Sequence, residues 1–252
     1  TGGVGDKVSI VLLPIVASLG VPVAKMSGRG LGFTGGTVDK MESIPGYKTN
    51  IDIQKFKENV HKIGISMIGQ TMNLAPADKK IYALRDLTAT VESIPLIASS
   101  IMSKKLASGV DKIVIDVKVG EAAFMKTIES ARELANLMVK IGKNKGKETI
   151  CVLTNMDEPL GNNIGNALEV HESIDVLKGN GPKDLIEVAT TLASLMVSLG
   201  KNISYDEALK EVNENLKNGK AYEKFKEMVN SQNGNIENIP VSKHIFSIKS
   251  KK

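Results

Sequence analysis

The sequence contains no tryptophan and a single cysteine, and only 4% of its residues are aromatic. One thiol cannot form an internal disulfide, so Cys151 fits a reducing compartment, and its apolar, strand-like surroundings predict a buried, unreactive side chain. So few aromatic rings leave little surface on which bases could stack, and we expect no nucleic-acid partner. No apolar run reaches the roughly 18 residues of a membrane span, and no export signal is visible. These absences predict a cytoplasmic protein that is not bound to a membrane.

What the sequence does contain is enough apolar material for a substantial core. The 252 residues are 42% hydrophobic and 24% charged, which suits a soluble α/β protein of one or two domains. The net charge of +5 is spread along the chain, apart from a dense basic run at 243–252 that we expect to be solvated. The sequence opens at Thr1, directly on a glycine-rich loop, so we expect the chain to be incomplete.

Apolar strand-like runs alternate with helical periodicity along most of the sequence. Strands are expected at 21–26, 65–69, 112–117 and around 149–153, and helices at 7–19, 56–63, 79–107 with an interruption near 93–95, 123–141, and most of the chain to about 229. This alternation predicts an α/β fold with a largely parallel sheet flanked by helices. Residues 232–240 have the composition of a linker, and 245–248 have the pattern of a further strand.

Two glycine-rich stretches, at 1–6 and 27–42, are the most informative feature of the sequence. Glycine lets backbone amides curl around an oxyanion, and the first stretch precedes a helix whose positive end would face the same ligand. It is not a Walker A loop, because Asp6 stands where that motif has lysine. A phosphate loop assisted by the hydroxyl of Ser9 and a plain helix-capping turn both remain open.

In the second stretch, Gly30, Gly32 and Gly35 have the GxGxxG spacing of a dinucleotide-binding loop. The match is weak, because the loop is too long and the helix that follows ends early at Pro45. A phosphate site explains the stretch better, since its backbone amides could converge on one anion together with the hydroxyls of Ser27 and Thr37.

A third group of polar residues lies at 74–104. Ser100 and Lys104 are four residues apart and share a helix face, and Tyr82 and Arg85 precede them. A guanidinium, an ammonium and a hydroxyl suit a planar ring that is rich in acceptors and becomes anionic as it leaves. Taken alone, Arg85 and Lys104 would more often be solvated surface charges.

The stretch 27–42 resembles the signature of the thymidine and pyrimidine-nucleoside phosphorylases. The resemblance is closer to the bacterial enzymes of broad specificity than to the strict thymidine phosphorylases. The resemblance continues through 69–71, 75–79, 82–86, 93–105, 116–120, 160–161, 165–169 and 177–185. It implies a nucleoside phosphorylase/phosphoribosyltransferase architecture, with an active site between an α/β domain and a smaller all-α domain. The implied division is 1–72 and 109–231 for the α/β domain, 73–108 for helices of the α domain, and 232–252 for a linker and the start of a truncated C-terminal domain.

The resemblance also implies roles for single residues. The phosphate would contact Ser9, Lys25, Met26, Ser27 and Thr37. The pyrimidine would be held by the catalytic residues Arg85, Ser100 and Lys104, with Tyr82, Leu31, Val91, Ile97 and Phe124 nearby. Some bacterial members bind a cation such as K⁺ at the positions of Gly5, Lys7, Leu160, Asn163 and Glu172. No organic cofactor is implied, inorganic phosphate is the co-substrate, and the full-length protein is expected to be a homodimer.

Several departures from the family pattern bear on these expectations. The family has a Lys-His-Ser triplet before the first loop, and this chain begins just after it. Phe33 stands where relatives usually have histidine, and Glu121 replaces a small residue. Lys7 occupies a cation-ligand position that is often threonine, and its ammonium could replace the metal.

The resulting hypothesis is phosphorolysis of uridine, thymidine or deoxyuridine to the free base and a pentose 1-phosphate. A phosphoribosyltransferase of the anthranilate type is the related alternative, although the glycine loops lack the acidic residues that a magnesium–pyrophosphate unit requires. A truncated, non-catalytic ligand-binding chain is the third reading, and the missing triplet is its support.

Overall fold

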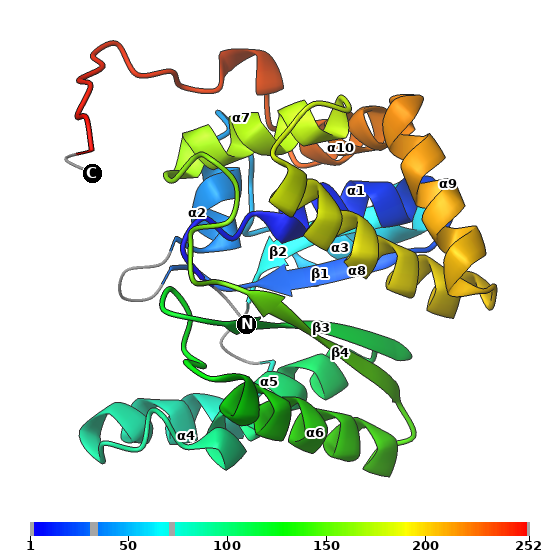
Figure 1. The fold of residues 1–252 in the computed structure, drawn as a ribbon. Helices are drawn as coiled ribbons and strands as arrows, with labels where there is room; N and C mark the ends of the chain where they lie inside the picture. The colour runs from blue at the N-terminus through cyan, green and yellow to red at the C-terminus, as the bar shows by residue number, and fades with distance from the viewer. Residues whose placement is uncertain (1–2, 31–34, 71–73, 251–252) are drawn as a thin grey trace.

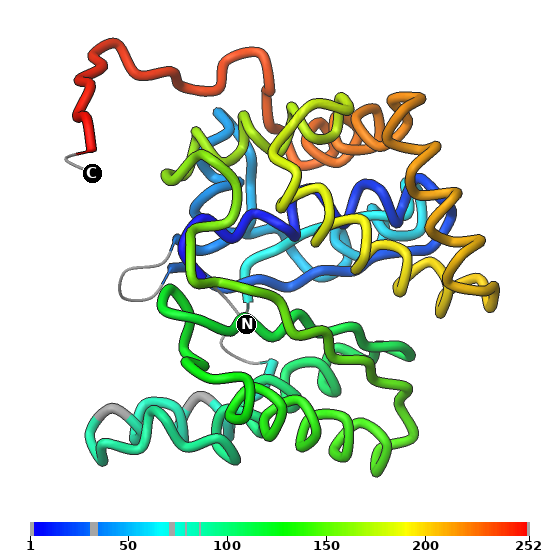
Figure 2. The backbone as a smooth tube through the Cα atoms, in the orientation of Figure 1, coloured from blue at the N-terminus to red at the C-terminus, as the bar shows by residue number. Residues whose placement is uncertain are grey.

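The computed structural model describes residues 3–30, 35–70 and 74–250 (Figures 1 and 2). In chain order its elements are α1 (Val8–Ser18), β1 (Val23–Ser27), α2 (Thr37–Glu42), α3 (Ile53–Ile63), β2 (Ile65–Gly69), α4 (Pro76–Leu87), α5 (Ile94–Ala107), β3 (Lys112–Val119), α6 (Ile128–Asn144), β4 (Glu148–Asn155), α7 (Asn166–Leu177), α8 (Lys183–Lys201), α9 (Tyr205–Lys217), α10 (Lys220–Ser231) and the short 3₁₀ helix η1 (Ile236–Asn238).

The strands form two parallel pairs. β1 pairs with β2 in a register that places Val23 opposite Ile65, and β3 pairs with β4 over all eight residues of each strand. The α/β fold and the parallel pairing are therefore as predicted, but the described strands divide between two short sheets instead of one. Helices supply both crossovers, α2 and α3 between β1 and β2, and α6 between β3 and β4 (Figure 1).

Each pair of strands belongs to its own hydrophobic core. The larger core surrounds α1, which is apolar on all sides and packs against α7, α8, α9 and α10. The smaller core fills the space between β3, β4, α5 and α6. Figure 1 shows these as an upper and a lower layer, with α4 and α6 at the bottom edge.

Local sequence signals account for most element ends. Gly20 and Gly64, with φ of 86° and 76°, end α1 and α3 in the left-handed conformation that glycine adopts without strain. α6 begins at Ile128, later than the expected 123, because Thr127 caps it by accepting a hydrogen bond from the Ser130 amide at 3.2 Å. Residues 123–127 therefore lie outside the helix, in a turn that contributes to the site described below.

Two further expectations concern β-structure. Residues 245–248 were predicted as a strand, but they form no ladder with any strand in the described part of the chain, and their apolar side chains are exposed. Cys151 lies on β4 as predicted and is partly buried, and burial raises its pKa to about 11, so the thiol is protonated at neutral pH. Over the ranges described above, no helix is both long and apolar enough to cross a bilayer.

Candidate active site

A cavity of about 670 Å³ opens between the two glycine-rich loops and the α4–α5 hairpin. Its upper wall comes from residues 3–9 at the start of α1, the carboxyl end of β1, and the loop that leads to α2. Its lower wall comes from α4, α5 and the turn before α6. The volume is typical of a site for a small molecule.

All five residues predicted to contact phosphate line the upper wall. β1 delivers Lys25, Met26 and Ser27 at its carboxyl end, and Ser9 and Thr37 lie in the first turns of α1 and α2. Parallel strands end at one edge of a sheet, so the glycine loops that follow or face them collect there. This wall therefore offers three hydroxyls and an ammonium to one ligand.

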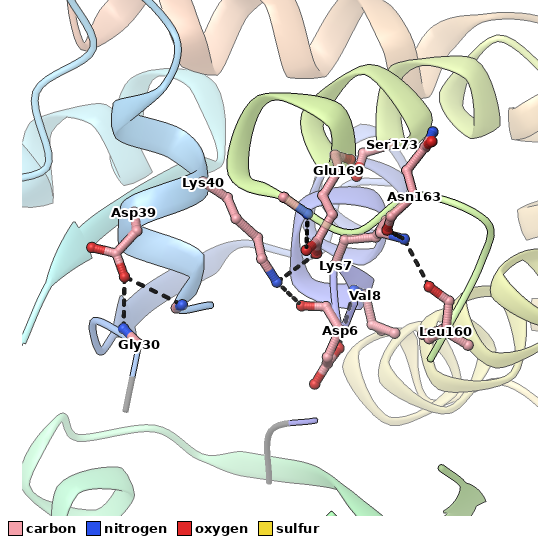
Figure 3. Close-up of polar contacts among 12 residues, drawn as sticks. Asp6, Lys7, Val8, Gly30, Asp39, Lys40, Leu160, Asn163, Glu169 and Ser173 are labelled. Atoms are coloured by element: carbon pink, nitrogen blue, oxygen red, sulfur yellow. Dashed lines mark hydrogen bonds and ion pairs between the residues drawn. The ribbon is translucent and has the colours of Figure 1, made fainter. Parts of the chain in front are cut away.

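Asp39 of α2 closes the long glycine loop, a role that inspection of the sequence did not identify. Its Oδ2 accepts hydrogen bonds from the amides of Gly30 at 2.6 Å and Gly36 at 3.2 Å (Figure 3). Burial acts to raise the pKa of Asp39, but these hydrogen bonds and the Arg29 guanidinium outweigh it, so the pKa lies below its usual value. A Cβ on residue 36 would collide with the backbone of Gly30, so position 36 requires glycine.

A buried ion pair joins both glycine loops to α7. The Lys40 ammonium lies 2.6 Å from Glu169 Oε2 and donates to the Asp6 carbonyl, also at 2.6 Å (Figure 3). Both side chains of the pair are almost fully buried. Because Lys40 lies on α2 and Asp6 in the first loop, this pair fixes the two halves of the upper wall relative to one another. The sequence offered no local signal for it.

Among the described residues, three ammonium groups line the cavity, on Lys25, Lys104 and Lys105. Repulsion from Lys25, followed by burial and the charge of Lys104, lowers the pKa of Lys105 to about 7. Burial also lowers the pKa of Lys25, against the opposing attraction of Asp6. Like charges held this close favour an anionic ligand, because an anion relieves their repulsion. Lys105 is a second site residue that the sequence pattern did not single out.

The lower wall contains the predicted pair on α5. The Lys104 ammonium donates to Ser100 Oγ at 2.7 Å and forms an ion pair of 2.6 Å with Asp78 of α4. Tyr82 and Phe124 also line this wall, both more than one-third exposed. The spacing of four residues therefore places the hydroxyl and ammonium together, as expected.

Arg85, the third predicted catalytic residue, is placed differently. Its guanidinium donates to the carbonyls of Thr90, at 3.4 Å, and Val91, and lies 5.1 Å from the ring centroid of Tyr82. Arg85 is not among the described residues that line the cavity. The loop after α4 turns these carbonyls back toward the last helical turn, where a guanidinium satisfies them. The expected convergence of three groups is thus seen for two of them.

The remaining predicted site residues are those expected near the pyrimidine and those assigned to a cation. Ile97 packs against the smaller core, and Val91 is exposed. Leu31, with Phe33, lies outside the described residues. The five positions assigned to a cation do come together, from the first loop, the 160–163 turn and α7, and these are Gly5, Lys7, Leu160, Asn163 and Glu172.

Comparison with known proteins gives a consistent family. Residues 1–222 match the model described as glycosyl transferase family, a/b domain. The chain is 58% identical over 235 residues to pyrimidine-nucleoside phosphorylase of Bacillus subtilis, covering 93% of the chain and 54% of that protein. It is 54% identical over 259 residues to the protein of the same name from Staphylococcus epidermidis, covering all of the chain and 60% of the relative. The chain therefore spans little more than half the length of these relatives.

A solved structure supports the same architecture. Anthranilate phosphoribosyltransferase from Thermus thermophilus superimposes with a TM-score of 0.58, covering 92% of this chain and 74% of that one. At 14% sequence identity, the likeness concerns the fold alone.

Proposed function

The chain belongs to the glycosyl transferase family whose a/b domain it matches, and on this basis we propose that it carries out the phosphorolysis of pyrimidine nucleosides. A phosphate oxygen attacks C1′ of uridine, thymidine or deoxyuridine while the bond from C1′ to the base nitrogen breaks. The electron pair of that bond leaves with the base, whose nitrogen then takes up the proton that the phosphate releases. The products are the free pyrimidine and ribose 1-phosphate or deoxyribose 1-phosphate.

The observation that carries this proposal is the composition of the two cavity walls. The upper wall offers hydroxyls from Ser9, Ser27 and Thr37 beside the Lys25 ammonium, which suits phosphate, and Lys105 of α5 adds a second positive charge from the lower wall. Phosphate bound there would lie across the cavity from the lower wall, with the pentose between them. Most of the acceleration would come from holding the two reactants in this order.

The lower wall suits a pyrimidine that gains negative charge as it leaves. Lys104 supplies a positive charge where the charge develops, and Ser100 offers a hydroxyl that orients the ring. Asp78 fixes the Lys104 ammonium at 2.6 Å, so Lys104 needs little reorganisation during the reaction. Tyr82 and Phe124 supply apolar surface for the faces of the ring.

Arg85 fits this proposal only with a conformational change. To reach the base, its guanidinium must leave the carbonyls of Thr90 and Val91. We expect the α4–α5 hairpin to close on the glycine loops when both substrates are bound, in the manner of other enzymes with two-walled sites. This closure would exchange two backbone hydrogen bonds for contacts with the charged leaving group.

The test is release of uracil or thymine with and without inorganic phosphate. It uses the product of the complete open reading frame alongside the 252-residue chain. We expect phosphate-dependent release, and a loss of about 100-fold or more in kcat/KM for Lys104→Gln. Lys145→Gln, at an exposed lysine beyond the end of α6, is the matched control and should keep full activity. Phosphate-independent release, or none from either protein, would contradict the proposal.

Two further measurements on the same proteins separate the other two readings. Consumption of phosphoribosyl pyrophosphate with magnesium would favour the phosphoribosyltransferase, for which the only support is the shared fold. Binding of phosphate or uracil without turnover by the complete protein would favour a ligand-binding role. Neither outcome is compatible with phosphorolysis.

We further propose that the protein acts in the cytoplasm as a homodimer. Ile81, Leu84 and Leu87 give α4 a large exposed apolar face, with Leu87 82% exposed. A second copy packed on this face would cover it. Light scattering after size exclusion tests this, because a Leu84→Glu/Leu87→Glu variant should become monomeric, whereas a monomeric parent protein would refute it.

A further inference from the structure

The cluster assigned to a cation already contains a positive charge from the chain itself. The Lys7 ammonium lies 2.5 Å from Glu172 Oε2 and donates to the carbonyls of Leu160 at 2.7 Å and Asn163 at 3.0 Å. An ammonium has three donors, so these oxygens satisfy it completely. Figure 3 shows Lys7 reaching from the start of α1 toward Leu160 and Asn163. Two carbonyls and a carboxylate are also oxygen ligands of the kind that K⁺ or Ca²⁺ takes.

The residues present do not fit an additional cation. The Lys7 side chain is 0% exposed and that of Glu172 is 5% exposed, so the site holds one buried positive and one buried negative charge. The Glu172 carboxylate is satisfied further by the amides of Asn162 at 2.9 Å and Asn163 at 3.3 Å. A second cation would leave the site with an uncompensated charge out of contact with water, which is strongly unfavourable.

The cluster is also too tightly packed for an ion beside the ammonium. Gly161 has φ of 72°, and a Cβ there would collide with the Glu172 carboxylate and lie 2.9 Å from Lys7 Nζ. A Cβ on Gly5, whose φ is 73°, would lie 2.9 Å from the Leu160 carbonyl oxygen. Glycine at these two positions therefore lets the first loop and the 160–163 turn pack closely within the cluster.

We propose that the Lys7 ammonium takes the place of a bound metal cation in this chain. It is a positioning residue, because it connects the first glycine loop and the start of α1 to the 160–163 turn and to α7. The chain therefore needs no monovalent cation to hold its upper cavity wall. This proposal stands on the buried cluster alone and does not depend on which reaction the cavity supports.

The test compares thermal melting in KCl and in tetramethylammonium chloride at equal ionic strength, using the product of the complete open reading frame. The unmodified protein should have the same Tm in both salts. It should also retain less than one equivalent of Rb⁺, by elemental analysis, after equilibration with RbCl and buffer exchange. A K⁺-specific rise in Tm, or stoichiometric Rb⁺ that is retained, would overturn the proposal.

Two substitutions make the test more specific. Lys7→Thr removes the ammonium and leaves the oxygens of Leu160, Asn163 and Glu172 around an open space, so its Tm should fall in tetramethylammonium and rise with each increase in KCl. Lys7→Met keeps the volume without a charge, so its Tm should fall equally in both salts. A Lys7→Thr protein that folds but ignores K⁺ would count against the proposal. If Lys7→Thr does not fold in either salt, the two measurements on the unmodified protein decide the outcome.

Discussion

The lysine cluster at the cavity makes a quantitative prediction about anion binding and pH. Lys105 has a pKa of about 7 because Lys25 repels its positive charge, and burial and Lys104 act in the same direction. A dianion bound between these groups would replace repulsion by attraction and raise the pKa of Lys105 toward the usual value for lysine, near 10.5. Binding must then be accompanied by proton uptake, so the affinity must fall as the pH rises.

The size of the effect follows from the two pKa values. Below pH 7 Lys105 is charged before and after binding, so the affinity changes little. Above pH 7 the free protein has lost a proton that the complex retains, and the association constant falls toward tenfold per pH unit. Between pH 6 and pH 8 we therefore expect the titration of Lys105 to contribute a loss of about tenfold in affinity. Burial acts to raise the pKa of Asp6, the acidic side chain facing Lys25 in the cavity, but lowering effects led by the charge of Lys118 outweigh it, so Asp6 stays ionised throughout.

Sulfate is the appropriate probe, because phosphate itself titrates in this range. Isothermal titration calorimetry at pH 6, 7 and 8, in buffers of different ionisation enthalpy, measures both the affinity and the proton uptake. Lys105→Gln should bind sulfate more weakly at pH 6 and lose most of the pH dependence. Lys210→Gln, at an exposed lysine on α9, should behave like the parent. Equal sulfate affinity at pH 6 and pH 8 in the parent, or an unchanged pH dependence in Lys105→Gln, would refute the reasoning.

Three other predictions concern single interactions. Lys40→Met leaves the buried Glu169 carboxylate without its partner and should lower the free energy of unfolding, measured in urea, by about 3–5 kcal/mol. Most of this loss should be recovered in Lys40→Met/Glu169→Met, and a single variant as stable as the parent would contradict the prediction. Gly161→Ala should destabilise the protein more than Gly146→Ala, because both glycines have positive φ but only Gly161 lacks space for a Cβ. Equal losses of unfolding free energy in the two variants would show that close packing at Gly161 does not matter. Arg85→Ala should reduce kcat/KM for uridine by about 100-fold or more, equivalent to about 3 kcal/mol, and near-normal turnover would remove Arg85 from the mechanism.

The fold followed largely from local patterns in the sequence. The β-branched run at 112–117 and the short apolar runs near 23 and 65 predicted strands, and Gly20 and Gly64 predicted where helices end. Periodicity could not show how the strands divide between sheets, because pairing depends on contacts between distant segments. It also predicted a strand at 245–248 from β-branched and aromatic residues alone, and such a run forms no strand without a neighbour.

The candidate site was predictable where neighbours in sequence act together. Ser100 and Lys104 meet because helical spacing requires it, and Ser27 and Thr37 flank one loop. Interactions between distant segments left no comparable signal. The Lys7–Glu172 pair spans 165 residues, and only the family resemblance, not the local sequence around either residue, implied that the two lie at one site.

Side-chain direction was equally inaccessible from the pattern. Lys104 and Lys105 are adjacent in sequence, and only the packing of α5 shows that both face the cavity. The guanidinium of Arg85 follows the carbonyls of Thr90 and Val91, whose orientation is set by the loop after α4. A helical position therefore predicts a face, while the partners of a long side chain depend on the surrounding backbone.

The most direct test of the two-walled site is a crystal structure of the complete protein with phosphate and uracil bound together. Phosphate should lie within hydrogen-bond distance of Ser9, Ser27 and Thr37, and uracil should contact Ser100 and Lys104 across the cavity. Phosphate bound away from the glycine loops, or uracil bound away from α5, would contradict the proposed function at its central point.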